Sequence, residues 1–362
     1  MRRHWQRAPL LVRQAFPAFR DPLSRDEVLS LARSEEASSR LVQRRRGRWS
    51  LEHGPFDRRM LATLPARDWT ILVQDTNHFA RAADELLRAF DFIPHARIDD
   101  VMVSYAVPGG GVGPHVDSYD VFLLQGQGRR RWRISRQRDL DFVPGLPLKI
   151  LADFRPTQEF VLEPGDMLYL PPGVAHDGVA ESECLTWSIG FRAPSDEELA
   201  YAFLDHLRDT VSLAGHYGDA GAAPTAHPGE LPAAMVSHAE KALARIRWNR
   251  AAVLDFCGRF LTEPKPNVFF EPPARSLTPA AFRRRASRAG IALDPRSRLV
   301  FSGRMFFMNG EPVEAPPALR ASLRRLADAR RLPGPVTAPA AFWTLAHGWH
   351  AQRFVVIAED TP

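Results

Sequence analysis

Three residues with metal-binding side chains occur at a spacing that can support redox chemistry. His115 and Asp117 are two positions apart, and His176 lies farther along the chain. Residues two apart point to the same side of an extended backbone, so the first two side chains can reach one ion. Two histidines and one carboxylate can hold one face of an octahedral iron and leave three positions open, as an Fe(II) oxygenase requires. A His-x-Asp triplet alone is a weak signal, so its surroundings must decide its meaning.

The segment before the triplet is predicted to be a strand followed by a flexible loop. Asp99–Ala106 is apolar and β-branched, whereas Pro108–Pro114 is too rich in Gly and Pro for a helix or a strand interior. This loop lacks the Gly-Lys-Ser/Thr ending of a phosphate-binding loop, and no helical pattern follows it. We therefore interpret it as a lead-in that lets backbone approach the metal. A short buried strand is expected at Val121–Leu124, with a turn at Gln125–Gly128.

His176 follows a pattern of turn, strand and turn. Glu163–Asp166 predicts a turn, Met167–Leu170 predicts a strand, and Pro171–Gly173 predicts a tight turn. A lone histidine is more often a core or loop residue than a ligand. This frame, downstream of a His-x-Asp triplet, favours a ligand. The strand that His176 opens is expected to run to Arg192.

The predicted strand Arg129–Ile134 places an arginine on its apolar face. Alternation puts Arg130, Trp132 and Ile134 on one side, which should face inward, and three further arginines on the other. Burying an unpaired guanidinium is costly, so an anion must meet Arg130. A dicarboxylate cosubstrate bound in a bidentate manner would supply that anion. Ser104, on the strand before the glycine loop, is expected to add a hydroxyl donor, and the outward arginines are interpreted as a solvated face.

Longer stretches of the sequence resemble the signatures of the bacterial ribosomal oxygenases of the JmjC (cupin-like) group, the ribosomal protein arginine 3-hydroxylase type. They read SYAVPGGGVGPHVDSYDVFLLQGQGRRRWRI, EPGDMLYLPPGVAHDG and CLTWSIGFRAPS. The close match covers residues 99–195, and a looser one covers the rest. The resemblance implies an α+β protein with a double-stranded β-helix that uses Fe(II), 2-oxoglutarate and dioxygen. It also implies hydroxylation at the β-carbon of an arginine in the sixteenth protein of the large ribosomal subunit.

The sequence offers two candidate residues for recognition of a substrate arginine. Such a site needs an acceptor carboxylate and a flat apolar wall, and Tyr119 and Asp120 are candidates by proximity. The alternative is that Tyr119 packs and Asp120 caps a turn, and the sequence does not choose between them. No catalytic residue is expected beyond the metal site.

Two other functions stay open at this point. One is the same oxygenase chemistry on a histidine or on another protein. The other is a non-catalytic cupin-like regulator that binds nucleic acid. A degenerate site would be expected to lose a metal ligand or Arg130, and this sequence retains all four residues.

Composition is that of an ordinary globular protein. The chain has 362 residues, 45% hydrophobic and 25% charged, and no apolar run near the ~18 residues of a membrane span. Its first residues lack the continuous apolar stretch of a signal peptide. The two cysteines, Cys184 and Cys257, are expected to be reduced and structural, as in a cytoplasmic protein.

Three domains are predicted. Residues 1–195 form the JmjC/cupin-like catalytic domain, 196–263 a helical dimerisation region, and 264–362 a winged-helix-like domain. Helices are expected at Asp196–Ala214 and Leu231–Leu261, on either side of a Gly/Ala/Pro-rich break. The resemblance implies that this helical region forms a homodimer.

Charge differs between the predicted parts. Residues 265–362 contain 15 basic and 7 acidic residues, whereas residues 1–264 contain 33 basic and 35 acidic ones. A nearly neutral catalytic part is compatible with a basic ribosomal protein as substrate. In the basic part, Arg283–Arg285 and Arg324–Arg325 are candidate nucleic-acid contacts. The alternative is that both are solvated helix faces.

Overall fold

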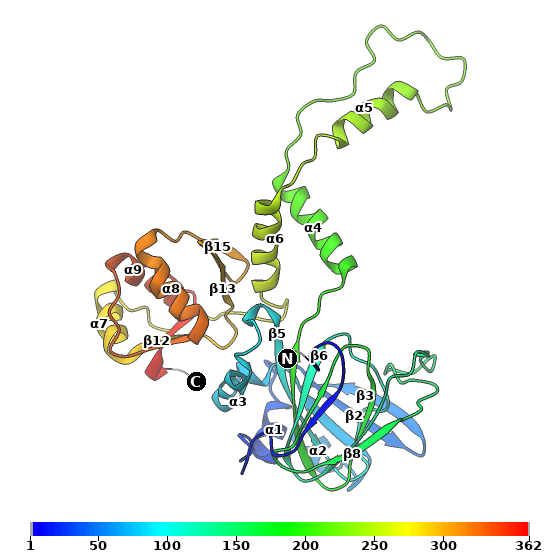
Figure 1. The fold of residues 1–362 in the computed structure, drawn as a ribbon, viewed down its shortest axis with the longest axis vertical. Helices are drawn as coiled ribbons and strands as arrows, with labels where there is room; N and C mark the ends of the chain where they lie inside the picture. Colours follow the sequence, from blue (N-terminus) through cyan, green and yellow to red (C-terminus); the bar gives the residue numbers. More distant parts are fainter. Residues whose placement is uncertain (1–2, 361–362) are drawn as a thin grey trace. The chain divides into compact units, whose positions relative to one another are not determined.

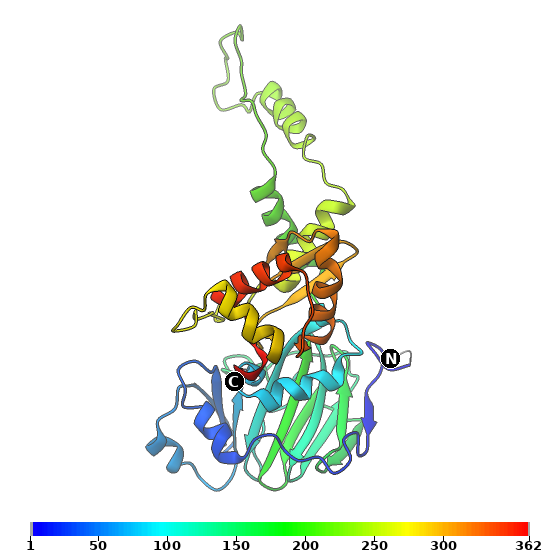
Figure 2. The same ribbon diagram turned by 90° about the vertical axis from the view of Figure 1, so that its left-hand side faces the viewer.

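The structure is a computed structural model that describes residues 3–360 (Figures 1 and 2). It contains two compact units, and each is described by itself. The first comprises residues up to Ala193 together with Val268–Ser297 and the segment from Ala329 onward. The second comprises Pro194–Asn267 and Arg298–Asp328. Within the described residues, no helix is long and apolar enough to cross a membrane.

The first unit is built on a large sheet of eight strands, whose spatial order differs from their order in the chain. Every pairing in this sheet is antiparallel. In spatial order its strands are β1 (Leu10–Val12), β9 (Met167–Leu170), β6 (Asp120–Gln127), β11 (Cys184–Phe191), β5 (Ile98–Ala106), β4 (Trp69–Val73), β2 (Ser39–Arg45) and β3 (Arg48–His53).

A smaller sheet faces the large one. It has the order β10 (Ala175–Ala180), β7 (Arg130–Ser135) and β8 (Gln158–Leu162). Val121 and Leu123 of β6 pack in one cluster with Trp132 and Ile134 of β7, so this cluster fills the space between the two sheets. Two facing antiparallel sheets around such a core form the double-stranded β-helix that the sequence predicted.

The other face of the large sheet is covered by short helices. These are α1 (Arg25–Leu31), α3 (Arg81–Leu87) and the 3-10 turns η1 (Thr76–His78), η2 (Arg88–Phe90) and η3 (His95–Arg97), with α2 (Arg58–Ala62) nearby in sequence. Figure 2 shows the cyan helix, α3, lying across the strands. Val28 of α1 and Leu87 of α3 join Ile71 and Val101 of the sheet in the largest apolar cluster. This second layer fixes α3 against β5, which matters for the site.

Two strand limits differ from the expected ones. The expected turn at Gln125–Gly128 is wrong in its first part, because β6 continues to Gln127 and only Gly128 has the positive φ of a turn, 63°. The single strand expected from His176 to Arg192 is two strands, β10 and β11. The N–H of Glu181 donates to the carbonyl of Arg129, which closes the connection between them.

The remainder of the first unit is a small sheet with two helices. The sheet has the order β16 (Arg331–Pro333), β12 (Gly290–Leu293) and β17 (Val355–Ile357), and the helices are α7 (Pro279–Ala289) and α9 (Ala340–Ala351), with η4 (Ala358–Asp360) at the end. Phe282 of α7 is fully buried and stacks on the ring of His350 of α9 at 4.9 Å. These contacts hold α7 and α9 on one small core.

The second unit contains α4 (Asp196–Thr210), α5 (Ala233–Leu243), α6 (Arg250–Thr262), the sheet β13 (Leu299–Ser302), β14 (Met305–Met308), β15 (Glu311–Val313), and most of α8 (Pro317–Ala329). The single helix expected over Leu231–Leu261 is wrong, because the chain breaks it into α5 and α6. Asn249 starts α6 by accepting a hydrogen bond from the N–H of Ala252 at 3.0 Å. Asparagine favours this cap position over a helix interior. The predicted three-domain boundaries stay a prediction.

Candidate metal and cosubstrate site

The two histidines of the predicted triad are joined through their backbones. The N–H of His115 donates to the carbonyl of His176, and the reverse bond is also made, each at 2.9 Å. This isolated bridge extends the small sheet beside β10 and brings the two rings to 4.2 Å between centroids. The glycine loop therefore runs as an irregular strand along β10, which explains why it needs residues without bulk.

Each imidazole turns the same nitrogen toward the backbone. Nδ1 of His115 donates to the carbonyl of Gly113, and Nδ1 of His176 donates to the carbonyl of Val174, both at 2.9 Å. A proton held on Nδ1 leaves Nε2 with its lone pair, and such second contacts orient metal-binding histidines. Both Nε2 atoms therefore face the same point as the third predicted ligand.

Asp117 completes the cluster. Its Oδ1 lies 3.7 Å from Nε2 of His115, and its Oδ2 lies 3.5 Å from Nε2 of His176. The three ligand atoms all lie within 4.8 Å of one another. The N–H of Gly173, in the Pro-Pro-Gly turn, donates to the carbonyl of Asp117 at 2.8 Å. Two histidines and one carboxylate at these separations fit a non-haem Fe(II) that keeps open positions.

Burial keeps one of these ligands in its neutral form. The His176 side chain is 3% exposed, whereas those of His115 and Asp117 are 25% and 19% exposed. Desolvation, and then the charge of His115, lowers the pKa of His176 to about 4. A neutral imidazole is the form that binds a metal. The cluster is thus closed on the His176 side and open to solvent on the other.

Arg130 points inward, as its strand position predicted, and it is 5% exposed. Its Nη1 donates to Oγ of Ser104 at 2.9 Å and to Oγ1 of Thr186 at 3.1 Å. Its Nε is buried and, among the described residues, has no hydrogen-bond partner. Sequence reasoning found Ser104 but missed Thr186, although the β5–β11 register places Thr186 directly opposite Ser104.

The outward arginines of β7 differ from Arg130 in their partners. Arg131 pairs with Glu159 and Glu181, and Arg133 pairs with Asp177. Within the part of the chain that the structure describes, no carboxylate pairs with Arg130. A buried guanidinium held only by hydroxyls is incomplete unless an anion joins it. A carboxylate of 2-oxoglutarate would supply the required charge and geometry.

The register of the small sheet places the anion end and the metal end on one face. Ile134 lies opposite His176, Trp132 opposite Gly178, and Arg130 opposite Ala180. Four residues of strand correspond to about 13 Å, so these two ends flank the indole between them. A Cβ on Gly178 would lie 2.6 Å from the ring of Trp132. Glycine is therefore required where the indole crosses β10.

A separate cavity of about 350 Å³ lies against the other face of β10. Its lining includes Asp177 and Val179, which alternate with His176, together with Gly111 and Trp49. Alternate residues of a strand point to opposite faces. This cavity is therefore distinct from the space between Arg130 and the triad.

The structure does not bring Asp120 to the site. Asp120 is fully buried, on the face of β6 that it shares with Phe122 and the helical layer. Its carboxylate pairs with Arg97 at 2.9 Å and accepts hydrogen bonds from the hydroxyl of Tyr169 and from Nε2 of Gln6. Both oxygens are thus used inside the fold. The proposal that Asp120 contacts substrate is corrected: it is a structural anion.

Tyr119, by contrast, packs on the inner side with Val121 and Leu123. Burial raises its pKa, and the charges of Asp117, Asp100 and Asp99 raise it further, in that order. The charge of Arg40 acts in the opposite direction, so groups of both signs influence this side chain.

Two of these carboxylates come from an irregularity in β5. Ile189 of β11 pairs with Val101, but Phe191 pairs with Ile98, so two residues of β5 oppose the single Gly190. These two residues, Asp99 and Asp100, form what we call the Asp99–Asp100 bulge. Bulges re-aim side chains and occur often beside active sites.

Gly190 leaves room for the bulge and the tyrosine together. A Cβ at this position would lie 3.3 Å from Oδ1 of Asp100 and 3.6 Å from Cε2 of Tyr119. Sequence reasoning missed both aspartates. Their only signal was a pair of acidic residues at the start of an otherwise apolar strand.

The fold and the chemistry of this site define a class: a JmjC-type oxygenase dependent on Fe(II) and 2-oxoglutarate. The family described as the JmjC domain matches residues 85–199, and the family described as the ROXA-like winged helix matches residues 245–339. The second match agrees with the winged helix predicted for the C-terminal part.

Similarity to individual proteins identifies the family within this class. The chain is 36% identical over 332 residues to the ribosomal protein uL16 3-hydroxylase of Escherichia coli, covering 90% of this chain and 88% of that one. It is 38% identical over 199 residues to a probable ribosomal oxygenase of Haemophilus influenzae, covering 54% and 49%. YcfD, a ribosomal oxygenase from Escherichia coli solved with cobalt and 2-oxoglutarate, matches with a TM-score of 0.83 and 31% identity over 98% of this chain and 96% of that one. The chain belongs to the ribosomal oxygenase family.

Proposed function

We propose that this chain hydroxylates the β-carbon of an arginine in the large-subunit ribosomal protein uL16. The observation that carries the proposal is the buried Arg130, which lacks a carboxylate partner among the described residues and shares a sheet face with His176. The relative named a uL16 3-hydroxylase, similar over 90% of this chain, supports the choice of substrate.

The chain's own residues would hold the reactants in fixed positions. His115, Asp117 and His176 would bind Fe(II), and Arg130 with Ser104 would bind the far carboxylate of 2-oxoglutarate. The bound metal and cosubstrate would supply the oxidising chemistry: 2-oxoglutarate loses carbon dioxide and becomes succinate, which takes one oxygen of dioxygen, and the other oxygen enters the substrate. The buried indole of Trp132 beside them would shield the reactants from water on that side.

The Asp99–Asp100 bulge and Tyr119 supply what recognition of an arginine requires. A guanidinium pairs well with carboxylates through charged hydrogen bonds, and its flat face packs on an aromatic ring. Tyr119 is two residues from Asp117 in the chain, and Asp100 and the ring of Tyr119 both lie beside Gly190. We infer that the substrate arginine enters here with its side chain between the acids and the ring.

Mass spectrometry tests this proposal directly. The protein is loaded with Fe(II) without oxygen and then incubated with 2-oxoglutarate, oxygen and peptides of ribosomal proteins. A gain of about 16 Da on an arginine of uL16, lost in His115→Ala and Arg130→Ala, supports the proposal. Arg131→Ala, on the outward face of the same strand, is the matched control and should retain activity. Consumption of 2-oxoglutarate with no modified arginine, or with a modified histidine, would move the substrate to the alternatives named above.

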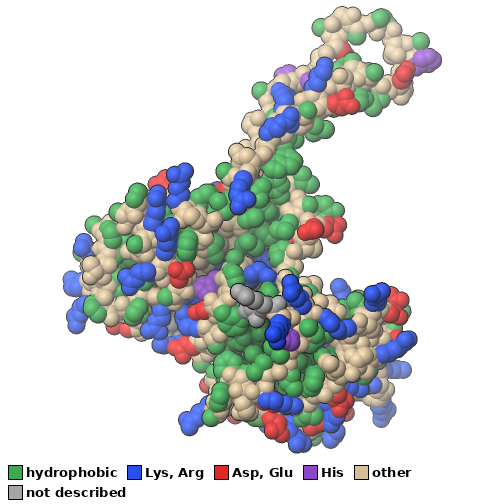
Figure 3. Space-filling view, in the orientation of Figure 1, with side chains coloured by type: hydrophobic (Ala, Val, Ile, Leu, Met, Phe, Trp, Pro, Cys, Tyr) green, Lys and Arg blue, Asp and Glu red, His purple; other side chains and the backbone are tan. Residues whose placement is uncertain are grey.

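We also propose that the protein forms a homodimer through its second unit. Large apolar side chains on and between α4, α5 and α6 are strongly exposed: Tyr201 63%, Leu204 61%, Leu243 64% and Trp248 58%. Figure 3 shows hydrophobic side chains gathered over α4 and α6. Exposed apolar patches of this kind mark protein interfaces. Light scattering should give twice the chain mass, and Leu204→Glu should halve it.

We also propose that the C-terminal part binds nucleic acid through its exposed arginines. Arg283 and Arg284 of α7 are exposed, but Arg285 pairs with Glu359, and Arg324 donates to the carbonyl of Gly303. The free part of the patch is thus smaller than the sequence indicated. Binding of ribosomal RNA that weakens steeply with salt and is lost in Arg283→Ala with Arg284→Ala would support it. The cytoplasm remains the expected compartment, because the proposed substrate is a ribosomal protein.

A further inference from the structure

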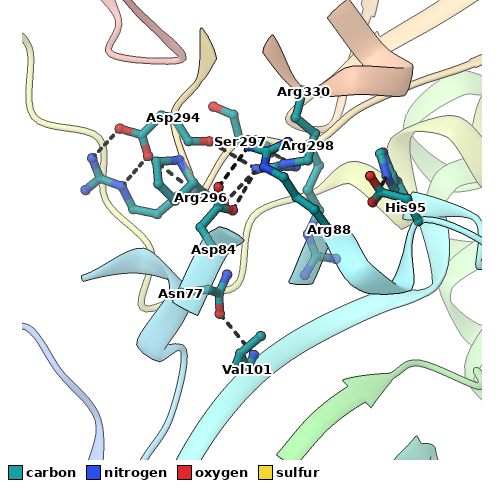
Figure 4. A network of polar contacts seen from close by, with 12 residues as sticks. Asn77, Asp84, Arg88, His95, Val101, Asp294, Arg296, Ser297, Arg298 and Arg330 are labelled. Carbon is teal, nitrogen blue, oxygen red and sulfur yellow. Dashed lines mark hydrogen bonds and ion pairs between the residues drawn. The ribbon is translucent and has the colours of Figure 1, made fainter. Parts of the chain in front are cut away.

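The Asp99–Asp100 bulge depends on a contact from outside the sheet. β4 ends at Val73, which pairs with Val103, so β5 loses its neighbour on this side before the bulge. The N–H of Val101 donates instead to Oδ1 of Asn77 at 3.0 Å (Figure 4). Asn77 is 3% exposed, so its oxygen replaces the missing strand in a place closed to solvent.

Asn77 lies on η1, which is itself fixed. Thr76 is fully buried, and its hydroxyl donates to a carbonyl at the end of β4 at 2.9 Å. The N–H of Asp75 donates to Oδ2 of Asp100 at 3.3 Å. The same short turn therefore contacts the backbone beside the bulge and one carboxylate of the bulge.

The helix that follows η1 is held by a cluster of charges, Asp84, Arg88 and Arg330 (Figure 4). Arg88 pairs with Asp84 at 3.1 Å and donates to the carbonyl of Ala329 at 2.9 Å. Arg330 lies 3.8 Å from the other oxygen of Asp84 and donates to the carbonyl of Ser297 at 3.1 Å. The cluster joins α3 to the C-terminal segments of the same compact unit.

Burial makes this cluster a firm attachment. The side chains of Asp84 and Arg330 are each 9% exposed. Arg330 also has a φ of 55°, in the left-handed region that a residue with a side chain seldom adopts. Removing Asp84 would leave the buried Arg330 without its carboxylate. The position of α3, and of η1 before it, is therefore tied to the segment that begins at Ala329.

We propose that Asn77 is a positioning residue for the substrate arginine, and that the Asp84–Arg88–Arg330 cluster extends this support to the C-terminal segments. Asn77 acts through the bulge and touches no reactant. The inference rests on the proposed function for its substrate. The segment that begins at Ala329 would thus influence substrate recognition without touching the substrate.

The first test compares two substitutions of nearly equal size. Asn77→Leu removes the acceptor for the N–H of Val101, whereas Asn77→Asp keeps it. The KM for the uL16 peptide should rise about tenfold in Asn77→Leu, with the KM for 2-oxoglutarate and peptide-independent 2-oxoglutarate consumption unchanged. In Asn77→Asp, which keeps the acceptor, the KM for the peptide should stay close to that of the natural protein. An unchanged peptide KM in Asn77→Leu, or an equal rise in both KM values, would overturn the proposal.

Backbone hydrogen exchange supplies a readout that needs no substrate. In Asn77→Leu, amides of residues 98–101 should exchange at least tenfold faster than in the natural protein, while those of β11 away from the bulge stay unchanged. Unchanged protection at 98–101 would overturn the role of Asn77 even if uL16 proves to be the wrong substrate. A natural protein that modifies no arginine peptide would refute the proposed function, and the exchange result would still decide the positioning role.

The contribution of the C-terminal segments is tested at the charged cluster. Arg330→Met should raise the peptide KM about threefold and speed exchange in η1, because α3 loses part of its anchor. Arg331→Met, at the exposed neighbouring position, is the matched control and should change neither. Equal effects of the two substitutions would refute the proposal that the segment beginning at Ala329 supports the bulge.

Discussion

The two ends of the site are built in different ways. At the cosubstrate end, Arg130, Ser104 and Thr186 come from regular strands whose register sets them opposite one another. At the proposed substrate end, the Asp99–Asp100 bulge breaks the register, and Asn77 accepts a hydrogen bond from the N–H of Val101 beside it. The difference suits the proposed tasks, since one end would receive the same small dicarboxylate each time and the other would accept a protein chain.

The largest expected effect is at the cosubstrate end. Arg130→Met should raise the KM for 2-oxoglutarate about 100-fold, because it removes charged hydrogen bonds that each contribute roughly 1.5–3 kcal/mol. Steady-state kinetics with varied 2-oxoglutarate measures the change. Arg131→Met should stay within about twofold of the natural protein, and a comparable loss there would mean that strand stability, not anion binding, explains the effect.

The next effect tests Trp132, whose indole lies between the Arg130 and His176 positions of the small sheet. Gly178→Ala places a methyl group 2.6 Å from the Trp132 ring, and such overpacking should lower the free energy of unfolding by about 1–3 kcal/mol. Urea unfolding followed by tryptophan fluorescence measures it. Gly348→Ala is the control, because nothing lies within 4 Å of the added group and alanine favours a helix. A neutral Gly178→Ala would show that the indole is free to move.

Asp120 and the aspartates of the bulge should differ in the property that their substitution changes, stability for Asp120 and the KM for the peptide for the bulge. Asp120→Asn should lower the free energy of unfolding by about 2 kcal/mol, because the Arg97 guanidinium loses its buried partner. Its peptide KM should not change. Thermal unfolding together with peptide kinetics gives both values, and a raised peptide KM at unchanged stability would return Asp120 to the substrate site.

Among the effects that compare the two ends, the smallest is expected at the bulge itself. Asp99→Asn and Asp100→Asn should each raise the peptide KM about tenfold, since a partly exposed carboxylate contributes less than a buried pair. The KM for 2-oxoglutarate should stay constant. If Arg130→Met and the bulge variants alter both KM values alike, the two ends are not separate and the comparison fails.

Much of the fold was predictable because its signals are local. The Pro-Pro-Gly turn before His176, the alternation around Arg130 and the strand Met167–Leu170 each follow from a few neighbouring residues. Boundaries were less predictable. The break between α5 and α6 rests on Asn249, whose value as a cap is small beside the helical pattern around it.

The sequence by itself determined the donor set, the inward arginine and the class of chemistry, because residue type and strand alternation are properties of short segments. Only the tertiary structure decided that Thr186 joins Arg130, that Asp120 faces the helical layer, and that Asp99 and Asp100 stand beside Tyr119. Each of these depends on which strands become neighbours and where their register shifts. Register is a long-range property, set by packing between segments that are far apart in the chain.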